Sequence, residues 1–370
     1  MKTWRYIDED EVTASYGLGA DEYLIQTHLD ESSPFPVSLR LYTYQDYAAL
    51  AGRFQDIRAE IDVDACRKHN FQIGRRLTGG GAIIMGAGQL GICLTSHSRV
   101  YSWNQVRELY HVFSEPILLA LQHLGIDARF REKNDLEANG KKIAGLGVYI
   151  SPEGGIQFHC SLLLDLDPVA MLKVLKIPIQ KIEDKRMIHA VTERITTIQR
   201  EGKESLSMHQ LKKRIIQSFE SHFDVQLKSS SFSQQEKGKI AELEQNRYGT
   251  DEWIYQHSPQ KDMEGMSLKK TAAGLLRTYI GLKGENIKSV LITGDFLGQG
   301  EALGKIESLL KWSPLDKNKI DEIVHRELAA VHEVGGLKAE EVTEAIWTAS
   351  QKALAAQRYT YKGSCYYPKA

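Results

Sequence analysis

The sequence predicts a mixed α/β protein with two parts, a principal domain over residues 1–256 and a small α+β domain over residues 267–370. Three observations favour this fold class. The 370 residues exceed the usual span of one domain. Short β-like runs alternate with helical patterns over residues 16–166. After a polar loop at residues 257–266, a hairpin pattern precedes amphipathic helices. We therefore expect two separately folded parts.

The principal domain is predicted to combine short strands with long helices. Residues 37–42 and 81–85 are β-like runs. Over residues 101–124, apolar side chains recur at three- and four-residue spacings, which indicates a helix with one buried face. Helical patterns return at 205–223 and 235–244, with a serine-rich turn at 229–233 between them. None of these helices carries obvious chemistry, so we interpret them as scaffold.

The small domain is predicted to contain a hairpin and helices. Two β-like runs, residues 271–282 and 287–293, flank the sequence KGEN, where glycine and asparagine tolerate positive φ. Amphipathic helical segments follow at residues 301–310, 316–330 and 338–355.

Composition limits the classes of function. Apolar residues make up 42% and charged residues 26%, as in a globular protein with a large core. The net charge of −1 argues against non-specific nucleic-acid binding. The start is polar and acidic and no apolar stretch of about eighteen residues occurs, so we expect neither a signal peptide nor a membrane span, and a cytoplasmic location. The dispersed cysteines, which disfavour a zinc site or a disulfide framework, are Cys66, Cys93, Cys160 and Cys365.

The most informative stretch is residues 75–83, RRLTGGGAI. Glycine costs roughly 0.5–1 kcal/mol relative to alanine in a regular element, so three in succession are expected where the chain needs positive φ or a close approach. Bare backbone N–H groups can bind an acyl or phosphate oxygen, and arginine offers a planar fork to the same groups. A tight turn into a buried strand would explain the run equally. Because neither GxxxxGK[ST] nor a helix-opening GxGxxG is present, any phosphate would bind on a strand-loop-strand platform.

The second stretch is residues 133–145, KNDLEANGKKIAG. Asn139-Gly140 is the strongest two-residue hairpin signal, so Asp135 should lie on one strand and Lys142 near the start of the next. A lysine there can neutralise charge on a carboxylate and an α-phosphate during adenylation, and a nearby aspartate can hold Mg²⁺. The alternative is an exposed hairpin with a solvated lysine pair.

The third stretch is residues 158–165, FHCSLLLD, which has the pattern of a strand. In an extended strand His159 and Ser161 point to one face and Cys160 to the other. We therefore expect His159 and Ser161 to line a site together. A buried, hydrogen-bonded histidine and a structural cysteine are the alternative.

Together the three stretches resemble the biotin/lipoate protein ligase family, specifically its lipoate-protein ligase branch. The family's arginine pair, Ser or Thr and triple glycine resemble residues 75–81. Its Asn-Asp…Gly-x-Lys-[Ile/Val]-[Ser/Ala]-Gly element resembles residues 134–145, and its His-Gly-[Thr/Ser]-Leu-Leu element resembles residues 159–163. The resemblance covers most of the chain. It implies a mixed β-sheet catalytic domain of the biotin/lipoate ligase type with a small C-terminal α+β accessory domain.

The resemblance implies an ATP-dependent, AMP-forming ligase. Lipoate and Mg-ATP would give lipoyl-AMP and pyrophosphate, and a lysine of a lipoyl carrier protein would then take the acyl group. Lys142 would be the catalytic residue, and Asp135 would lie by the Mg²⁺. The other residues implied to hold ATP or lipoate are Arg76, Thr78, Gly79, Gly80, Gly81, Ala82, Ile83, Ile84, Asn134, Gly145, His159 and Ser161. The carrier would be a glycine-cleavage protein, a dehydrogenase acyltransferase subunit or a specialised lipoate-binding protein, with no nucleic acid or membrane as partner.

Two departures from the family pattern keep another activity open. Met85-Gly86 replaces a His-Asp pair, and Cys160 stands where ligases typically have glycine. The alternative is an octanoyl or lipoyl transferase that acts through a Cys160 thioester without ATP. Against it, residues 191–196 resemble the ligases and lack the cysteine of one octanoyltransferase class, and the accessory domain also favours a ligase. A non-catalytic carrier binder is the third possibility, and the retained Lys142 speaks against it.

Overall fold

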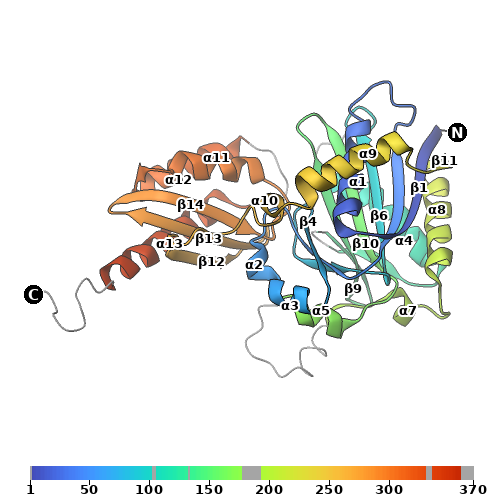
Figure 1. Cartoon of the computed structure of the whole chain (residues 1–370), viewed down its shortest axis with the longest axis horizontal. Helices are drawn as coiled ribbons and strands as arrows, with labels where there is room; N and C mark the ends of the chain where they lie inside the picture. The colour runs from blue at the N-terminus through green and yellow to red at the C-terminus, as the bar shows by residue number, and fades with distance from the viewer. Residues whose placement is uncertain (1, 102–105, 132–133, 177–192, 331–335, 360–370) are drawn as a thin grey trace, which may run out of the picture. The chain divides into compact units, whose positions relative to one another are not determined.

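The computed structural model divides into two compact units. It describes the chain except residues 1, 102–105, 132–133, 177–192, 331–335 and 360–370, and the side chains of residues 357–359. The first unit comprises residues 1–53 and 57–256, and the second comprises residues 54–56 and 257–370. Figure 1 shows that each unit has its own sheet and helices. The short segment 54–56 packs with the second unit, where the Tyr279 hydroxyl donates to Asp56 at 3.0 Å.

A mixed eight-stranded sheet forms the centre of the first unit, so the predicted fold class is confirmed. The strand order is β11-β1-β2-β6-β10-β9-β8-β7. β1 is parallel to β2 and to β11, and every other pair is antiparallel. The strands are β1 (Lys2–Val12), β2 (Ser38–Tyr44), β6 (Gln89–His97), β7 (Ala128–Arg131), β8 (Asp135–Ala138), β9 (Lys141–Ile150), β10 (Gly155–Leu163) and β11 (Val225–Ser230).

Helices cover both faces of this sheet. α1 (Ala14–Thr27), with α9 (Gln234–Leu243) beside it, covers one face, and α4 (Val106–His123), with α8 (Met208–Phe223) beside it, covers the other (Figure 1). On the α4 side the Phe113 and Phe158 rings lie 5.6 Å apart. The shorter helices are α2 (Ile57–Glu60), α3 (Val63–Lys68), α5 (Pro168–Val174), α7 (Ile198–Glu201), the π-helix η1 (Glu244–Tyr248) and α10 (Asp251–Ile254). The face under α1 is the one that carries the candidate site.

A second, three-stranded sheet in the first unit presents the glycine-rich loop. β3 (Ala48–Ala51) pairs in parallel with β4 (Gln72–Arg75) and antiparallel with β5 (Ile83–Met85). The glycine-rich loop, residues 76–82, connects β4 to β5. It therefore lies on the strand-loop-strand platform that the sequence predicted.

The second unit is a four-stranded antiparallel sheet with helices. Its order is β12 (Gly265–Lys270), β13 (Leu275–Lys283), β14 (Asn286–Gly294) and β15 (Ser313–Pro314). The predicted turn between β13 and β14 is confirmed, with Gly284 at a φ of 62°. The helices are α11 (Gly300–Leu310), α12 (Lys317–Ala329) and α13 (Ala339–Tyr359). Leu276, Ile280, Ile306 and Ile346 belong to one buried cluster that joins this sheet to its helices.

Three local predictions were wrong or incomplete. The serine-rich segment 229–233 is not wholly a turn, because Ser229 and Ser230 end β11, which pairs with β1. The loop predicted at residues 257–266 ends in β12, which had no prediction as a strand. The helix predicted at residues 101–124 is confirmed from Val106 to His123, and residues 102–105 lie outside the described part of the chain. In the first two cases strand pairing, of β11 with β1 and of β12 with β13, outweighs local composition.

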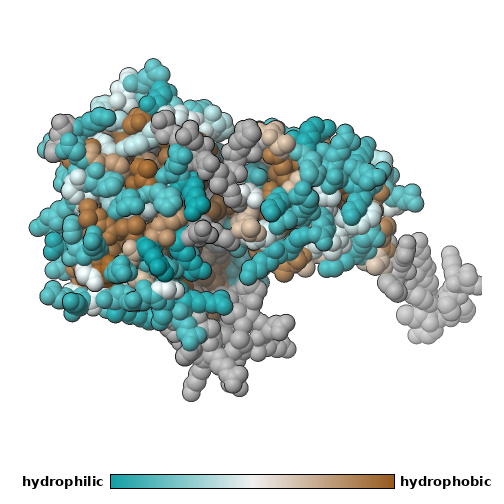
Figure 2. Space-filling view, turned by 180° about the vertical axis from the view of Figure 1, so that it is seen from behind, coloured by the Kyte–Doolittle hydropathy of each residue, from teal (hydrophilic) through white to brown (hydrophobic). Residues whose placement is uncertain are grey.

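Hydrophilic residues cover most of the surface seen in Figure 2, and hydrophobic residues show as smaller patches, more of them on the first unit. The exposed large hydrophobic side chains are Val100, Val112, Val169, Met266, Leu268, Leu309 and Trp312. No helix in the described parts of the chain is long and apolar enough to cross a membrane.

Candidate active site

The glycine-rich loop is held in shape from within by Arg76. This side chain is 5% exposed and donates to the carbonyl oxygens of Leu50 at 2.7 Å, Gly79 at 3.3 Å and Gly81 at 2.9 Å. Burial lowers the pKa of Arg76 to about 10, so the guanidinium stays charged at neutral pH. Arg76 thus fixes the loop backbone, and it places a buried positive charge beneath the loop.

Arg75 and Gly52 fix the other side of the loop. Arg75 is fully buried and donates to the carbonyl oxygens of Gly52 and Arg53, each at 2.9 Å, and of Ile254 at 2.8 Å. A Cβ on Gly52 would lie 2.0 Å from the Gly80 oxygen, so only glycine fits there. Gly80 itself has a φ of 91°, in the region that favours glycine. The loop therefore has one backbone path, set by contacts on both sides.

Small residues on β6, β10 and β9 form a row on the α1 face of the main sheet, and we call this row with the side chains that lie over it the trough. Gly91, Ser161 and Gly145 stand in one cross-strand row, and His159 pairs with Gly147 in the next. A Cβ on Gly147 would lie 2.7 Å from the His159 Nε2 and 3.0 Å from the Thr78 Cβ. The glycine-rich loop and β10 therefore meet over Gly147, where Thr78 Oγ1 lies 3.4 Å from His159 Nε2.

Lys142 and Asp135 form an ion pair at the end of this trough. The Lys142 Nζ lies 2.7 Å from the Asp135 Oδ1, and the side chains are 30% and 24% exposed. Asn139 and Gly140 make the predicted two-residue turn, with φ of 50° and 74°. A Cβ on Gly145 would lie 3.1 Å from the Lys142 Nζ and 3.2 Å from the Ser161 Oγ. The Lys142 ammonium and the Ser161 hydroxyl therefore lie directly over Gly145, and Asp135 holds the ammonium there.

The segment of residues 195–196 pairs with β9 at Lys142. The Thr196 N–H donates to the Lys142 carbonyl at 2.8 Å, and Ile195 forms a parallel bridge with Lys142. Glu201, on α7, accepts from the Thr196 hydroxyl at 2.6 Å and from the Asn139 amide at 2.5 Å. This carboxylate thus ties α7 to both the hairpin turn and the segment beside Lys142. Of the sequence-predicted stretch 191–196, residues 191 and 192 lie outside the described part of the chain, as do Lys133 and Cys365.

The predicted residues fall into three groups. Those that surround the trough are Thr78, Asp135, Lys142, Gly145, His159 and Ser161. Those that build the loop are Arg76, Gly79, Gly80 and Gly81, followed by the partly exposed Ala82 and Ile83. Two serve the scaffold. The Ile84 side chain is buried in a core cluster with Ala49, and the Asn134 amide donates to the Leu146 carbonyl at 2.9 Å.

Sequence reasoning missed Gly147, whereas residues 52–55 resemble the segment that enters the site in the family, without a separate role for Gly52 or Arg53. Residues at alternate positions of a strand lie on the same face. The pair Gly145 and Gly147 could therefore have indicated a row of small residues on one face of the sheet. Arg53 lies over the Tyr149 ring at 5.4 Å, on the same face of β9 as Gly147.

Cys160 lies on the opposite face from His159 and Ser161, as the sequence predicted. It is 2% exposed, on the same face of β10 as Phe158, which contacts α4. Burial raises the pKa of the Cys160 thiol, although Lys142 opposes the shift. Burial likewise raises the pKa of Cys66 to about 11 and that of Cys93 well above its usual range. None of the three described thiols has the lowered pKa that a nucleophilic cysteine requires.

His159 is expected to make stability depend on pH. Burial, assisted by Arg76, lowers its pKa from 6.5 to about 3. Between pH 6.5 and pH 3, His159 is therefore protonated in the unfolded chain but not in the folded protein. The free energy of unfolding falls as the pH decreases through this range. Denaturant unfolding should show wild type losing about 2 kcal/mol more than His159→Gln between about pH 8 and pH 5. The same pH dependence in both proteins would contradict this assignment.

No group of three or more His, Cys, Asp or Glu side chains that could hold a metal ion occurs among the described residues. Mg²⁺ needs fewer protein ligands, since it is commonly bound by one or two carboxylates together with substrate phosphates and water. Asp135 is half-buried beside the trough and fits that requirement.

The fold and the site place the chain among the mixed α/β proteins of the lipoate-ligase type. Residues 13–220 match the family model described as the lipoyl protein ligase A/B catalytic domain. The chain belongs to this family of enzymes, which contains both lipoate-protein ligases and octanoyltransferases.

Relatives of both kinds are similar to the chain. The octanoyltransferase LipM of Bacillus subtilis (strain 168) is 27% identical over 277 residues, which cover 69% of this chain and 98% of that protein. The lipoate-protein ligase LplJ of the same organism is 24% identical over 344 residues, which cover 92% of this chain and 99% of that protein.

Solved structures share the fold. The lipoate complex of LipL1 from P. falciparum is 16% identical with a TM-score of 0.74, covering 93% of this chain and 99% of that one. A bi-partite lipoate protein ligase from Thermoplasma acidophilum is 23% identical with a TM-score of 0.62, covering 70% and 99%.

Proposed function

We propose that this protein is a lipoate-protein ligase that uses ATP to form lipoyl-AMP and then acylates a lysine of a lipoyl carrier protein. The observation that carries the proposal is the extent of the similarity. The likeness to the ligase LplJ covers 92% of the chain, whereas the likeness to the octanoyltransferase LipM covers 69%. Residues 257–370 with 54–56 form a unit that LipM is too short to match in full.

The trough suits the first step of this reaction. A lipoate carboxylate oxygen attacks the α-phosphorus of ATP, the bond to the β-phosphate oxygen breaks, and pyrophosphate leaves. Lys142 can neutralise charge on the reacting carboxylate and phosphate, because its ammonium lies over Gly145 and is partly exposed. Asp135, 2.7 Å from that Nζ, orients the lysine. Asp135 would also be the protein ligand to a Mg²⁺ ion bound with the phosphates, and the ion would add further positive charge there.

The second step needs the same lysine. The neutral amine of the carrier lysine attacks the acyl carbon of lipoyl-AMP, the acyl–phosphate bond breaks, AMP leaves with the electron pair, and the amine gives up a proton to water. Lys142 again faces the negative phosphate as it departs. His159 is neutral at physiological pH, so its ring and the Thr78 hydroxyl present polar but uncharged groups to the bound molecule. Gly145 and Gly147 carry no side chain, so the side chains of Lys142, Ser161, His159 and Thr78 can lie directly over β9.

The competing function is acyl transfer through a Cys160 thioester. The family contains octanoyltransferases, so this function has support from LipM. The position of Cys160 argues against it, because the thiol lies on the α4 side of the sheet, on the opposite face from His159 and Ser161. A thiol with a raised pKa is also a poor nucleophile at neutral pH.

Pyrophosphate release separates the two functions. We expect wild type to release pyrophosphate when given ATP, Mg²⁺ and free lipoate, and Cys160→Ser to retain most of that activity. Cys66→Ser is the matched control, since it places a hydroxyl at another buried cysteine. The ligase proposal fails if wild type releases no pyrophosphate and instead transfers octanoyl groups from acyl-carrier protein in a reaction that Cys160→Ser abolishes.

The carrier is proposed to be a lipoyl domain. The structure of the Thermoplasma acidophilum ligase is described together with its E2 lipoyl domain. A domain of this kind presents the acceptor lysine to the trough in the second step. The glycine-cleavage protein and a specialised lipoate-binding protein are carriers of the same chemical class.

A further inference from the structure

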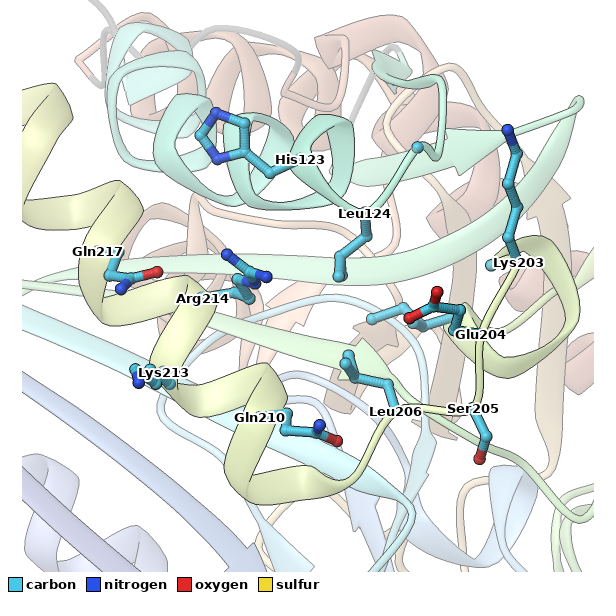
Figure 3. Close-up of a pocket in the computed structure, with 13 residues that line it drawn as sticks. His123, Leu124, Lys203, Glu204, Ser205, Leu206, Gln210, Lys213, Arg214 and Gln217 are labelled. Carbon is cyan, nitrogen blue, oxygen red and sulfur yellow. The ribbon is translucent and has the colours of Figure 1, made fainter.

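An open cavity of about 610 Å³ lies in the first unit, away from the trough. Its walls are the C-terminal end of α4, the loop of residues 202–206, and the exposed side of α8 (Figure 3). The mechanism proposed above uses none of these residues.

The walls of this cavity carry an excess of positive charge. Lys203, Lys213 and Arg214 line it and are all exposed. Glu204 is the single carboxylate among the lining residues. Among the described residues, no carboxylate lies within ion-pair distance of Lys203, Lys213 or Arg214, which contrasts with the paired Lys142 and Lys212. In a chain with a net charge of −1, this is a local cationic surface that an anionic partner can use.

One wall of the cavity, the loop of residues 202–206, is connected to the strand of Lys142. The loop 202–206 follows α7 directly, and Glu201 on α7 accepts hydrogen bonds from Asn139 and Thr196. Asn139 lies in the same hairpin as Lys142, and the Thr196 N–H donates to the Lys142 carbonyl. The chain from Thr196 to Lys203 can span at most about 25 Å. A small domain is roughly 30 Å across, so one domain placed over the cavity is large enough to extend to the strand of Lys142.

We propose that this cavity docks an acidic surface of the carrier domain that receives the acyl group. This proposal rests on the proposed function and adds how the partner is recognised. Exposed charge pairs act mainly on encounter and orientation, so they should affect the affinity for the carrier and its salt dependence. They should leave the activation of lipoate unchanged, because that step needs no carrier.

The test is a charge reversal of the cavity, Lys203→Glu with Lys213→Glu and Arg214→Glu. The substrate is the apo form of an E2 lipoyl domain that wild type modifies. We expect kcat/KM for that domain to fall by about tenfold or more at low salt, and its salt dependence to flatten. Pyrophosphate release with lipoate and ATP, measured without the domain, should match wild type. The matched control reverses three exposed lysines elsewhere on the same unit, as Lys228→Glu with Lys237→Glu and Lys239→Glu, and should change neither quantity.

The possible outcomes distinguish the two proposals. If wild type releases no pyrophosphate, the ligase proposal fails. If release is normal and the cavity variant modifies the lipoyl domain as well as wild type does, the docking proposal fails. Calorimetric titration with inorganic pyrophosphate provides a further measurement. Binding that the cavity variant loses, with an unchanged kcat/KM for the lipoyl domain, would identify a small-anion site and overturn the docking proposal.

Discussion

Replacing Lys142 by alanine is expected to lower lipoyl-AMP formation by about 10²–10³-fold, because one preorganised charge at the reacting phosphate is worth that much in comparable sites. Fold stability should change little. The Lys142–Asp135 pair is partly exposed, and such pairs contribute roughly 0–1 kcal/mol. Pyrophosphate release measures the first effect, and thermal unfolding measures the second.

Lys141→Ala is the matched control for this variant. Lys141 is the preceding residue on β9, and successive side chains of a strand point to opposite faces. We expect Lys141→Ala to retain nearly all of the pyrophosphate release. A strong loss in Lys141→Ala with normal release in Lys142→Ala would show that the other lysine carries the chemistry.

Gly52→Ala is expected to lower activity strongly by displacing the glycine-rich loop. The added Cβ would lie 2.0 Å from the Gly80 oxygen, and both groups are backbone or attached directly to it, so no side-chain rotation relieves the clash. Overpacking of this kind costs about 1–3 kcal/mol, and here the strain falls on the loop that contains Thr78. We expect lipoate-dependent pyrophosphate release to fall at least about tenfold in an otherwise folded protein.

Gly238→Ala provides the control for glycine replacement. Gly238 lies in α9 and a Cβ there would meet nothing within 4 Å, so alanine should leave activity intact and stabilise the helix by about 1 kcal/mol. Circular dichroism and denaturant unfolding would report both effects. Wild-type activity in Gly52→Ala would show that the loop does not depend on the close approach of Gly52 to Gly80.

Features encoded by neighbouring residues could be predicted from the sequence. Asn139 and Gly140 specify a two-residue turn by themselves, and that turn places Asp135 and Lys142 on adjacent strands. The turn at Gly284 is also encoded locally, although Gly284 has a positive φ and Glu285 does not. By contrast, β11 is a strand because β1 lies beside it, and its serine-rich end gives no local sign of that pairing.

The site shows the same division. That His159 and Ser161 share a face follows from the two-residue period of a strand. The different roles of Arg75 and Arg76 do not follow from the motif that contains both. They depend on which carbonyl groups surround each guanidinium, and those of Arg75 come partly from Trp253 and Ile254, far along the chain. Likewise, Gly147 is required because Thr78 and His159 come from two other segments.

The pairing of β1 with β11 has a consequence for synthesis on the ribosome. Arg5 and Ser230, which bond across these strands, are 225 residues apart in the chain. Synthesis proceeds at about 5–20 residues per second, so β11 leaves the ribosome roughly ten to fifty seconds after β1. The edge of β1 that pairs with β11 stays unpaired for that time. During that time the edge presents unpaired backbone groups on which another nascent chain can assemble. Slow translation or scarce chaperones should therefore reduce the yield of this enzyme through its first strand, far from the residues that carry its chemistry.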